Sequence, residues 1–298
     1  MTLTERMKSS PRLGLMLAGG GFLFISLDSL GLRLAETSSW NATFWLGVFT
    51  FLAMSVLVPI RNSKSLFKAA WEGGLPLAVS AIFTAGSISM FVVAISLTTV
   101  ANTVAIIAAA PVMAALISLV AIGERTRLRT WIGIVASIAG ILVIVSGSLG
   151  AGRIIGDLSA VGAIIIFGSN LTLLRRYPEL NRLVIIGMGG LAMALIASWP
   201  ADPLSLDTSS IVVLAVLGLA TSPAGRIAVI TSTRYLPPAQ VSLFAPIETI
   251  AATTWAWLFL SEAPPPLTIV GGLIVVAAVV YGTTGQSPTA TDDMATAP

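Results

Sequence analysis

The chain has 298 residues, of which 56% are hydrophobic and only 10% are charged, whereas roughly a quarter of the residues of an ordinary soluble domain are charged. Its net charge of +3 is spread over short segments between apolar stretches, which argues against a nucleic-acid partner. Cysteine and histidine are both absent, so disulfides, imidazole chemistry and the usual metal and haem ligand sets are excluded and no cofactor is expected. This composition predicts an all-α integral membrane protein.

Apolar stretches of about twenty residues recur from Leu13 to Gly282, and each is long enough to cross a bilayer as a helix. Helices are expected because a membrane barrel would instead show alternating segments of about ten residues. The first stretch begins like a signal peptide but continues past Leu30 without a small-residue cleavage site, so it is expected to be retained. Breaks by charge, proline or glycine give ten expected helices at 13–35, 40–60, 73–96, 100–122, 129–148, 157–174, 183–200, 209–233, 238–260 and 266–283.

The basic residues predict the orientation of these helices, because segments rich in Lys and Arg resist translocation. With the N-terminus inside, thirteen of the sixteen basic residues fall on the cytoplasmic side, Arg153 falls in an outer loop, and Arg33 and Arg226 lie within helices. Both termini are therefore expected in the cytoplasm, with the protein in the inner (cytoplasmic) membrane. The tail at 286–298 is rich in Thr, Ala, Pro and Asp, so it is expected to be a disordered cytoplasmic tail.

A weak internal repeat appears when the chain is shifted by about 138 residues along itself. The shift places a Glu at the end of an apolar stretch, and a Gly nine residues after it, on like residues: Glu124 on Glu262 and Gly133 on Gly271, with Asn102 on Gln240 and Thr130 on Thr268. Five helices in each half would place the second half upside down relative to the first, a common plan for secondary transporters. The expected units are 1–148 and the inverted 149–285, around a central cavity.

The same stretches resemble the drug/metabolite transporter superfamily, in its ten-helix EamA-type branch. The resemblance is carried by Pro111 to Glu124 (PVMAALISLVAIGE) with Gly133, and by Glu248 to Glu262 (ETIAATTWAWLFLSE) with Gly271. The second half departs from the usual pattern at Thr249, where proline is common, and at Ser261, where glycine is common. Within the superfamily the chain looks most like the YddG-type exporters of aromatic and other amino acids. The resemblance implies a cavity lined by both halves, with helices five and ten peripheral.

Three charged residues lie deep in apolar stretches, where each costs roughly 2.5 to 3.5 kcal/mol to insert. Glu248 is expected near the bilayer midplane, where it either contacts a substrate ammonium, carries a proton, or forms an ion pair that fastens two helices. Arg226 follows Ser222-Pro223-Ala224-Gly225, so it either holds a substrate carboxylate beside a broken helix or snorkels to the interface. Asp28 is expected to face the bundle, in contact with substrate or in an interhelical hydrogen bond.

Asn170 occupies a position in helix six comparable to that of Asp28 in helix one, with the same two interpretations. Pro111 and Pro246 are expected to kink helices four and nine. Phe83, Met90, Phe91, Phe167 and Phe244 are expected to supply an apolar wall. The candidate substrate-binding residues are therefore Asp28, Met90, Asn102, Asn170, Arg226, Gln240 and Glu248.

These observations favour a secondary transporter that exports aromatic or other neutral amino acids and related small metabolites by alternating access. No GxxxxGK[ST] phosphate loop occurs in the chain, so ATP is not expected to drive transport. A nucleotide-sugar or cationic-drug exchanger of the same fold is the alternative. A membrane enzyme is not expected, because the chain offers no activated nucleophile, and a purely structural role would explain the deep charges only as ion pairs. Proton coupling and oligomeric state stay open.

Overall fold

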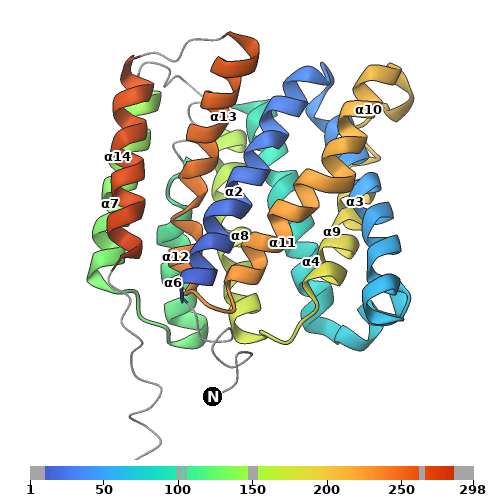
Figure 1. The fold of residues 1–298 in the computed structure, drawn as a ribbon, viewed down its shortest axis with the longest axis horizontal. Helices are drawn as coiled ribbons and strands as arrows, with labels where there is room; N and C mark the ends of the chain where they lie inside the picture. Colours follow the sequence, from blue (N-terminus) through green and yellow to red (C-terminus); the bar gives the residue numbers. More distant parts are fainter. Residues whose placement is uncertain (1–10, 99–102, 104–105, 147–153, 262–265, 285–298) are drawn as a thin grey trace, which may run out of the picture.

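The computed structural model describes residues 11–98, 103, 106–146, 154–261 and 266–284. The secondary structure over these residues is helical (Figure 1). The elements are α2 (Pro11–Leu34), α3 (Ser39–Asn62), α4 (Leu66–Leu97), α6 (Ala110–Ile122), α7 (Leu128–Val145), α8 (Ile154–Arg176), α9 (Arg182–Ala197), α10 (Thr208–Val216), a π-helical turn η2 (Leu217–Thr221), α11 (Ser222–Ser232), α12 (Pro238–Ser242), α13 (Ala245–Leu260) and α14 (Pro266–Thr283). A 3₁₀ turn, Pro203–Ser205, precedes α10.

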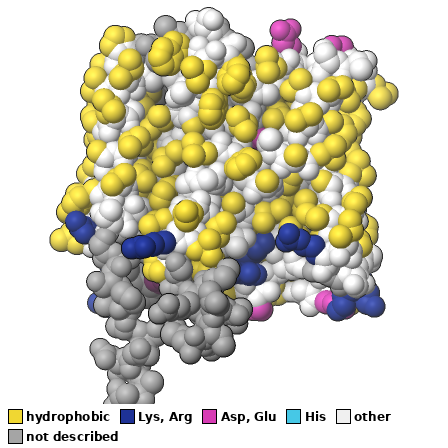
Figure 2. Space-filling model, viewed as in Figure 1, with side chains coloured by type: hydrophobic (Ala, Val, Ile, Leu, Met, Phe, Trp, Pro, Cys, Tyr) yellow, Lys and Arg dark blue, Asp and Glu magenta, His cyan; other side chains and the backbone are white. Residues whose placement is uncertain are grey.

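Within the described residues, six helical stretches are long and apolar enough to cross a membrane: Pro11–Leu32, Ser39–Arg61, Leu66–Ala94, Ile154–Arg176, Thr208–Ser232 and Pro266–Thr283. The surface agrees with this, because a broad band of hydrophobic side chains surrounds the bundle and Lys and Arg gather at one end of it (Figure 2). We call this the basic end; it is the end at which α2 begins and α14 finishes (Figure 1). The chain is a multi-pass membrane protein with an all-helical bundle.

Side-chain caps fix where several of these helices begin. Ser38 and Ser65 accept hydrogen bonds from the backbone N–H of Asn41 and Lys68, and so satisfy N–H groups that a helix leaves unpaired. Asp207 caps α10 outside the membrane-spanning part; the hydroxyls of Ser209 and Ser210 donate to its carboxylate and lower its pKa to about 2.

Two of the expected helices are broken rather than continuous. Expected helix nine (238–260) divides into α12 and α13 at Leu243–Phe244. Expected helix four (100–122) lies partly outside the described residues, and its described part turns at Ala108–Ala109 before α6 begins. Pro111 and Pro246 are each the second residue of the helix that follows the break, where a missing N–H costs little.

These breaks correct the alignment of the two halves. A shift of 138 residues placed Pro111 on Thr249, but the structure shows that the counterpart of Pro111 is Pro246. The difference arises because α13 has 16 residues and α6 has 13, which adds three residues to the second half between the proline and the later Glu.

Contacts between the halves have the symmetry of an inverted repeat. The helices pack as α2 on α11 and, equivalently, α4 on α8, while α3 on α9 and α7 on α14 are pairs of counterparts. In the last pair a Cβ placed on Gly133 would lie 2.8 Å from the carbonyl oxygen of Ala278, and one on Gly140 would lie 2.9 Å from that of Gly271. These two contacts exchange under the repeat. The α7 and α14 helices lie side by side at the edge of the bundle, as the resemblance implied (Figure 1).

Candidate functional site

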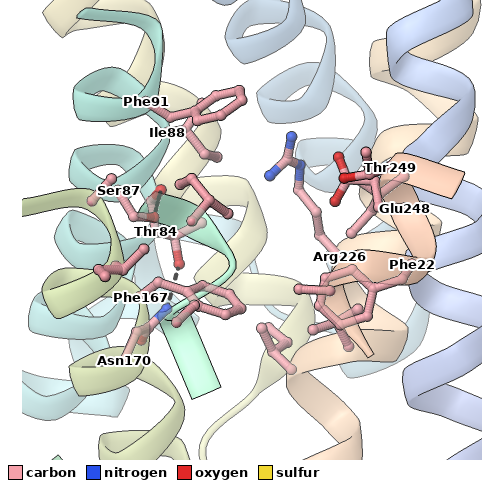
Figure 3. A pocket seen from close by; sticks show the side chains of 18 of the residues that line it. Phe22, Thr84, Ser87, Ile88, Phe91, Phe167, Asn170, Arg226, Glu248 and Thr249 are labelled. Atoms are coloured by element: carbon pink, nitrogen blue, oxygen red, sulfur yellow. Dashed lines mark hydrogen bonds between the residues drawn. The ribbon is translucent and has the colours of Figure 1, made fainter. Parts of the chain in front are cut away.

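A cavity of about 250 Å³ lies between the two halves (Figure 3). Its lining comes from seven helices, α2, α4, α6, α8, α9, α11 and α13, and from Ile107 before α6; neither α7 nor α14 contributes a lining residue. The lining is mainly apolar, with Thr84, Ser87, Asn170, Arg226, Glu248 and Thr249 as its polar members. An apolar hollow with a few polar groups from different elements is the usual form of a small-molecule site.

Arg226 is fixed on one wall of this cavity by two contacts. Its Nε donates to the hydroxyl of Ser222, one turn earlier in α11, at 3.0 Å. Its Nη2 contacts Oδ2 of Asp28 in α2 at 3.4 Å, and the side chains of this pair are 22% and 9% exposed. Asp28 therefore lies behind Arg226, while the guanidinium faces the cavity (Figure 3). The second carboxylate oxygen of Asp28 is buried and has no hydrogen-bond partner among the described residues.

Two features of α2 and α11 bring this pair together. A Cβ on Gly21 would lie 2.8 Å from the carbonyl oxygen of Gly225, so the two helices cross with their backbones almost in contact. The π-helical turn η2 and Pro223 interrupt regular α-helix just before Arg226. The close crossing places α11 against α2, and the interruption sets the direction in which Arg226 leaves the helix.

Glu248 enters the cavity from the first turn of α13, near Arg226 (Figure 3). No hydrogen bond or ion pair joins its carboxylate to any residue that the structure describes. A carboxylate at such a depth is costly unless it is paired or protonated. Because a helix N-terminus carries partial positive charge, the break at Leu243–Phe244 places Glu248 where a negative charge is favoured.

The opposite wall carries a neutral hydrogen-bonded group. The Oγ of Ser80 donates to Oδ1 of Asn170 at 2.7 Å, and Nδ2 of Asn170 donates to Oγ1 of Thr84 at 3.0 Å. Thr84 in turn donates to the carbonyl oxygen of Ser80 at 2.8 Å. This network ties α4 to α8 and presents Thr84 and Asn170 to the cavity.

The two polar walls are counterparts within the inverted repeat. The same separation of 142 residues along the chain relates Asp28 to Asn170, Ser80 to Ser222 and Thr84 to Arg226. One wall therefore holds a carboxylate, a serine and an arginine where the other holds a carboxamide, a serine and a threonine. The cavity is chemically polarised, with charge toward α2, α11 and α13 and neutral groups toward α4 and α8.

Apolar side chains fill the space between these walls. Phe22, Ile88, Phe91 and Phe167 surround the middle of the cavity, and Ile186 and Ile230 complete its lining toward the basic end. Sites for drug-sized ligands usually occupy about 300 to 1,000 Å³. A cavity of about 250 Å³ is therefore suited to a molecule no larger than a single amino acid.

Three of the seven expected binding residues line the cavity: Asn170, Arg226 and Glu248. Asp28 supports Arg226 from behind rather than lining it. Asn102 lies outside the described residues. The expectations for Met90 and Gln240 do not fit the cavity. Met90 packs its sulfur against Gly162 of α8 and is 39% exposed, whereas Gln240 is buried in α12, with its amide 3.5 Å from the hydroxyl of Thr130.

The rotation of each helix explains these two differences. In α4 the lining residues Thr84, Ser87, Ile88 and Phe91 follow a helical spacing that defines one face, and Met90 lies off that face. Among the expected aromatic residues, Phe91 and Phe167 line the cavity but Phe83 and Phe244 do not. The same helical spacing in α8, at Ala163, Phe167 and Asn170, was a signal in the sequence that could have identified the face.

Comparisons with known proteins place the chain in a family. The model of the EamA-like transporter family matches residues 12–146 and again residues 154–283. No curated protein sequence matches the chain. A solved structure titled "Crystal structure of protein" has a similar fold, with a TM-score of 0.75 and 17% sequence identity, over 91% of this chain and 97% of that one. Because the two family matches cover nearly all of the helical part, the chain belongs to the EamA-like transporter family, whose members carry small molecules across membranes.

Proposed function

We propose that this protein exports neutral amino acids, with aromatic ones among them, by alternating access across the cytoplasmic membrane. The observation that carries the proposal is the pairing of Arg226 and Glu248 beside one apolar cavity (Figure 3). A free amino acid always presents a carboxylate and an ammonium two bonds apart on one carbon. Arginine is suited to bind the first and a carboxylate to bind the second.

The rest of the cavity fits the remainder of such a substrate. With the zwitterionic group at α11 and α13, the side chain would extend toward Phe91 and Phe167 on α4 and α8. Burying an apolar side chain there contributes about 25 cal/mol per Å² removed from water. The resemblance to the YddG-type exporters of aromatic and other amino acids points to the same substrate class.

The basic end supports an orientation with both termini in the cytoplasm. Described helix ends there carry Arg61, Arg127, Arg175, Arg182 and Arg234, whereas the other end shows acidic side chains (Figure 2). Segments rich in Lys and Arg are retained on the cytoplasmic side. Export then corresponds to loading the cavity from the basic end.

A nucleotide-sugar substrate is less consistent with the cavity. Diphosphate groups need several cations, but Arg226 is the one basic residue among the described residues that line it, and Asp28 already shares its charge. The volume of about 250 Å³ is also small for such a molecule.

Reconstituted liposomes test the proposal directly. Purified protein should exchange internal unlabelled phenylalanine or leucine for the labelled amino acid outside, and Arg226→Ala and Glu248→Gln should each lower this counterflow at least tenfold. Lys64→Ala is the matched control, because Lys64 is an exposed cation paired with Glu72 at the surface. The proposal fails if wild-type protein exchanges no amino acid, or if both cavity variants exchange it as fast as the control.

A further inference from the structure

The charged groups around the cavity do not cancel one another. Asp28 and Glu248 are acidic and Arg226 is basic, so the three carry one net negative charge when both carboxylates are ionised. Uncompensated charge at this depth in a bilayer is strongly disfavoured. The cavity therefore needs one further positive charge, whether it is empty or occupied.

No other fixed cation faces these carboxylates within the described part of the chain. Against α13, α2 contributes Asp28, and α14 contains no charged residue. Across the cavity α11 contributes Arg226, and the lining residues of α4, α6, α8 and α9 are all uncharged. When the cavity is empty, the missing charge is a proton on one of the two carboxylates. Asp28 is paired with Arg226 and Glu248 has no partner among the described residues, so the proton belongs on Glu248.

We infer that the net charge of the substrate decides whether a proton is exchanged for it. This inference rests on the proposed function, and it adds a second substrate class, the primary amines that lack a carboxylate. The site accepts either class, because each leaves the occupied cavity without net charge.

A zwitterionic amino acid brings no net charge, so the proton stays in the cavity. The substrate carboxylate replaces Asp28 at the guanidinium of Arg226, and the substrate ammonium pairs with Glu248. The proton released by the Glu248 carboxyl is taken up by Asp28, whose buried second oxygen has no other hydrogen-bond partner among the described residues. One proton is present before and after binding, so amino acids move without proton exchange.

An organic ammonium brings one positive charge and leaves Arg226 to Asp28. Its ammonium pairs with the Glu248 carboxylate, and the proton of Glu248 passes to bulk water. When the amine leaves on the other side of the membrane, Glu248 takes a proton from the water there. Each amine is then exchanged for one proton moving the opposite way.

Substitution of either carboxylate separates the two substrate classes. Glu248→Gln leaves Asp28 and Arg226, which cancel, so the empty cavity holds no proton. A zwitterion keeps this cavity neutral but an amine would leave it positive. Asp28→Asn leaves Arg226 and Glu248, which also cancel, with the same consequence. Both variants should keep amino-acid binding, weakened, and lose amine binding.

The test compares phenylalanine with phenethylamine, which has the same side chain without the carboxylate. Calorimetry of purified protein, in two buffers with different ionisation enthalpies, measures how many protons are released when each ligand binds near neutral pH. We expect about one proton for each phenethylamine and none for phenylalanine. Glu248→Gln and Asp28→Asn should each lower phenethylamine affinity at least tenfold more than phenylalanine affinity.

Equal proton release for the two ligands, or release that persists in Glu248→Gln, would overturn the inference. Phenylalanine counterflow is measured on the same preparation. If counterflow is present while the proton counts are equal, the inference fails and the proposed function stands. If no amino acid binds or exchanges, both fail.

Discussion

Arg175 in α8 and Glu124, just beyond α6, form an ion pair at the basic end, with Nη2 of Arg175 3.1 Å from Oε1 of Glu124. The other terminal nitrogen of Arg175 donates to the carbonyl oxygens of Thr233 and Arg234, just after α11, at 3.3 and 3.4 Å. One guanidinium thus joins the ends of three helices, and Arg175 follows the cavity residue Asn170 by five residues, about 7.5 Å along α8. These contacts close the bundle between the cavity and the basic end.

Removal of this tie should favour opening toward the basic end. The pair is partly exposed, with side chains 29% and 24% accessible, so it contributes at most about 1 kcal/mol, or about a fivefold change in an equilibrium. The chain has no cysteine, so a single Ser87→Cys in the cavity reports access without interference. Labelling of this cysteine by an impermeant maleimide from the basic end should rise several-fold in Arg175→Ala.

Arg176→Ala is the matched control for that experiment. Its guanidinium donates to the carbonyl oxygen of Ala121 at 3.4 Å and lies over the ring of Tyr177, without contact to the turn after α11. If Arg176→Ala changes labelling as much as Arg175→Ala does, the effect is one of surface charge and the Arg175 tie does not hold the basic end closed.

Phe91 and Phe167 should decide how well the size of a substrate side chain is recognised. Both line the cavity opposite the charged wall. Their replacement by alanine removes the apolar surface that a large side chain would contact, which is worth about 1 to 3 kcal/mol. In each variant the affinity for phenylalanine and leucine should fall about tenfold or more, while that for alanine should change little, as measured by competition for counterflow. A uniform loss for all three amino acids would show that these rings hold the fold instead.

The sequence located the charged half of the site but not the neutral half. Asp28, Arg226 and Glu248 could be found because a charge in an apolar stretch needs an explanation. The role of Ser80 and Thr84 could not, because hydroxyls are common in membrane helices and their partners become evident only when α4 packs on α8. The shift of 142 residues was present in the sequence, but it differs from the shift of 138 that aligns the later motifs.

Helix breaks were the least predictable part of the fold. Pro111 and Pro246 indicated irregularity in the right places, but proline is tolerated both as a kink and as the start of a helix. The sequence could not decide between these, so expected helix nine was drawn as continuous through Leu243–Phe244. Gln240 was consequently expected at the cavity, whereas it lies before the break, beside Thr130.

Two adjacent glycines of α2 should respond oppositely to alanine. A Cβ on Gly21 would lie 2.7 Å from Val229 and 2.8 Å from the carbonyl oxygen of Gly225, whereas a Cβ on Gly20 would meet nothing within 4 Å. Gly21→Ala should push α2 from α11, separate Asp28 from Arg226, and lower both thermal stability and counterflow. Gly20→Ala should be neutral or stabilising by up to about 1 kcal/mol, because alanine favours helix. Similar melting temperatures for the two variants would contradict the close crossing of α2 and α11.

Asn170→Ala tests whether the neutral wall holds α4 to α8. The change removes the acceptor of the Ser80 hydroxyl and the amide donor to Thr84, both buried, and an unsatisfied buried polar group costs about 1 to 3 kcal/mol. The melting temperature of the purified protein, followed through its seven tryptophans, should fall by several degrees. Ser159→Ala is the matched control on the same helix, because its hydroxyl is exposed and bonds its own backbone at Ile155. If both variants melt together, Asn170 does not fasten the two helices, and its amide is free to serve the substrate alone.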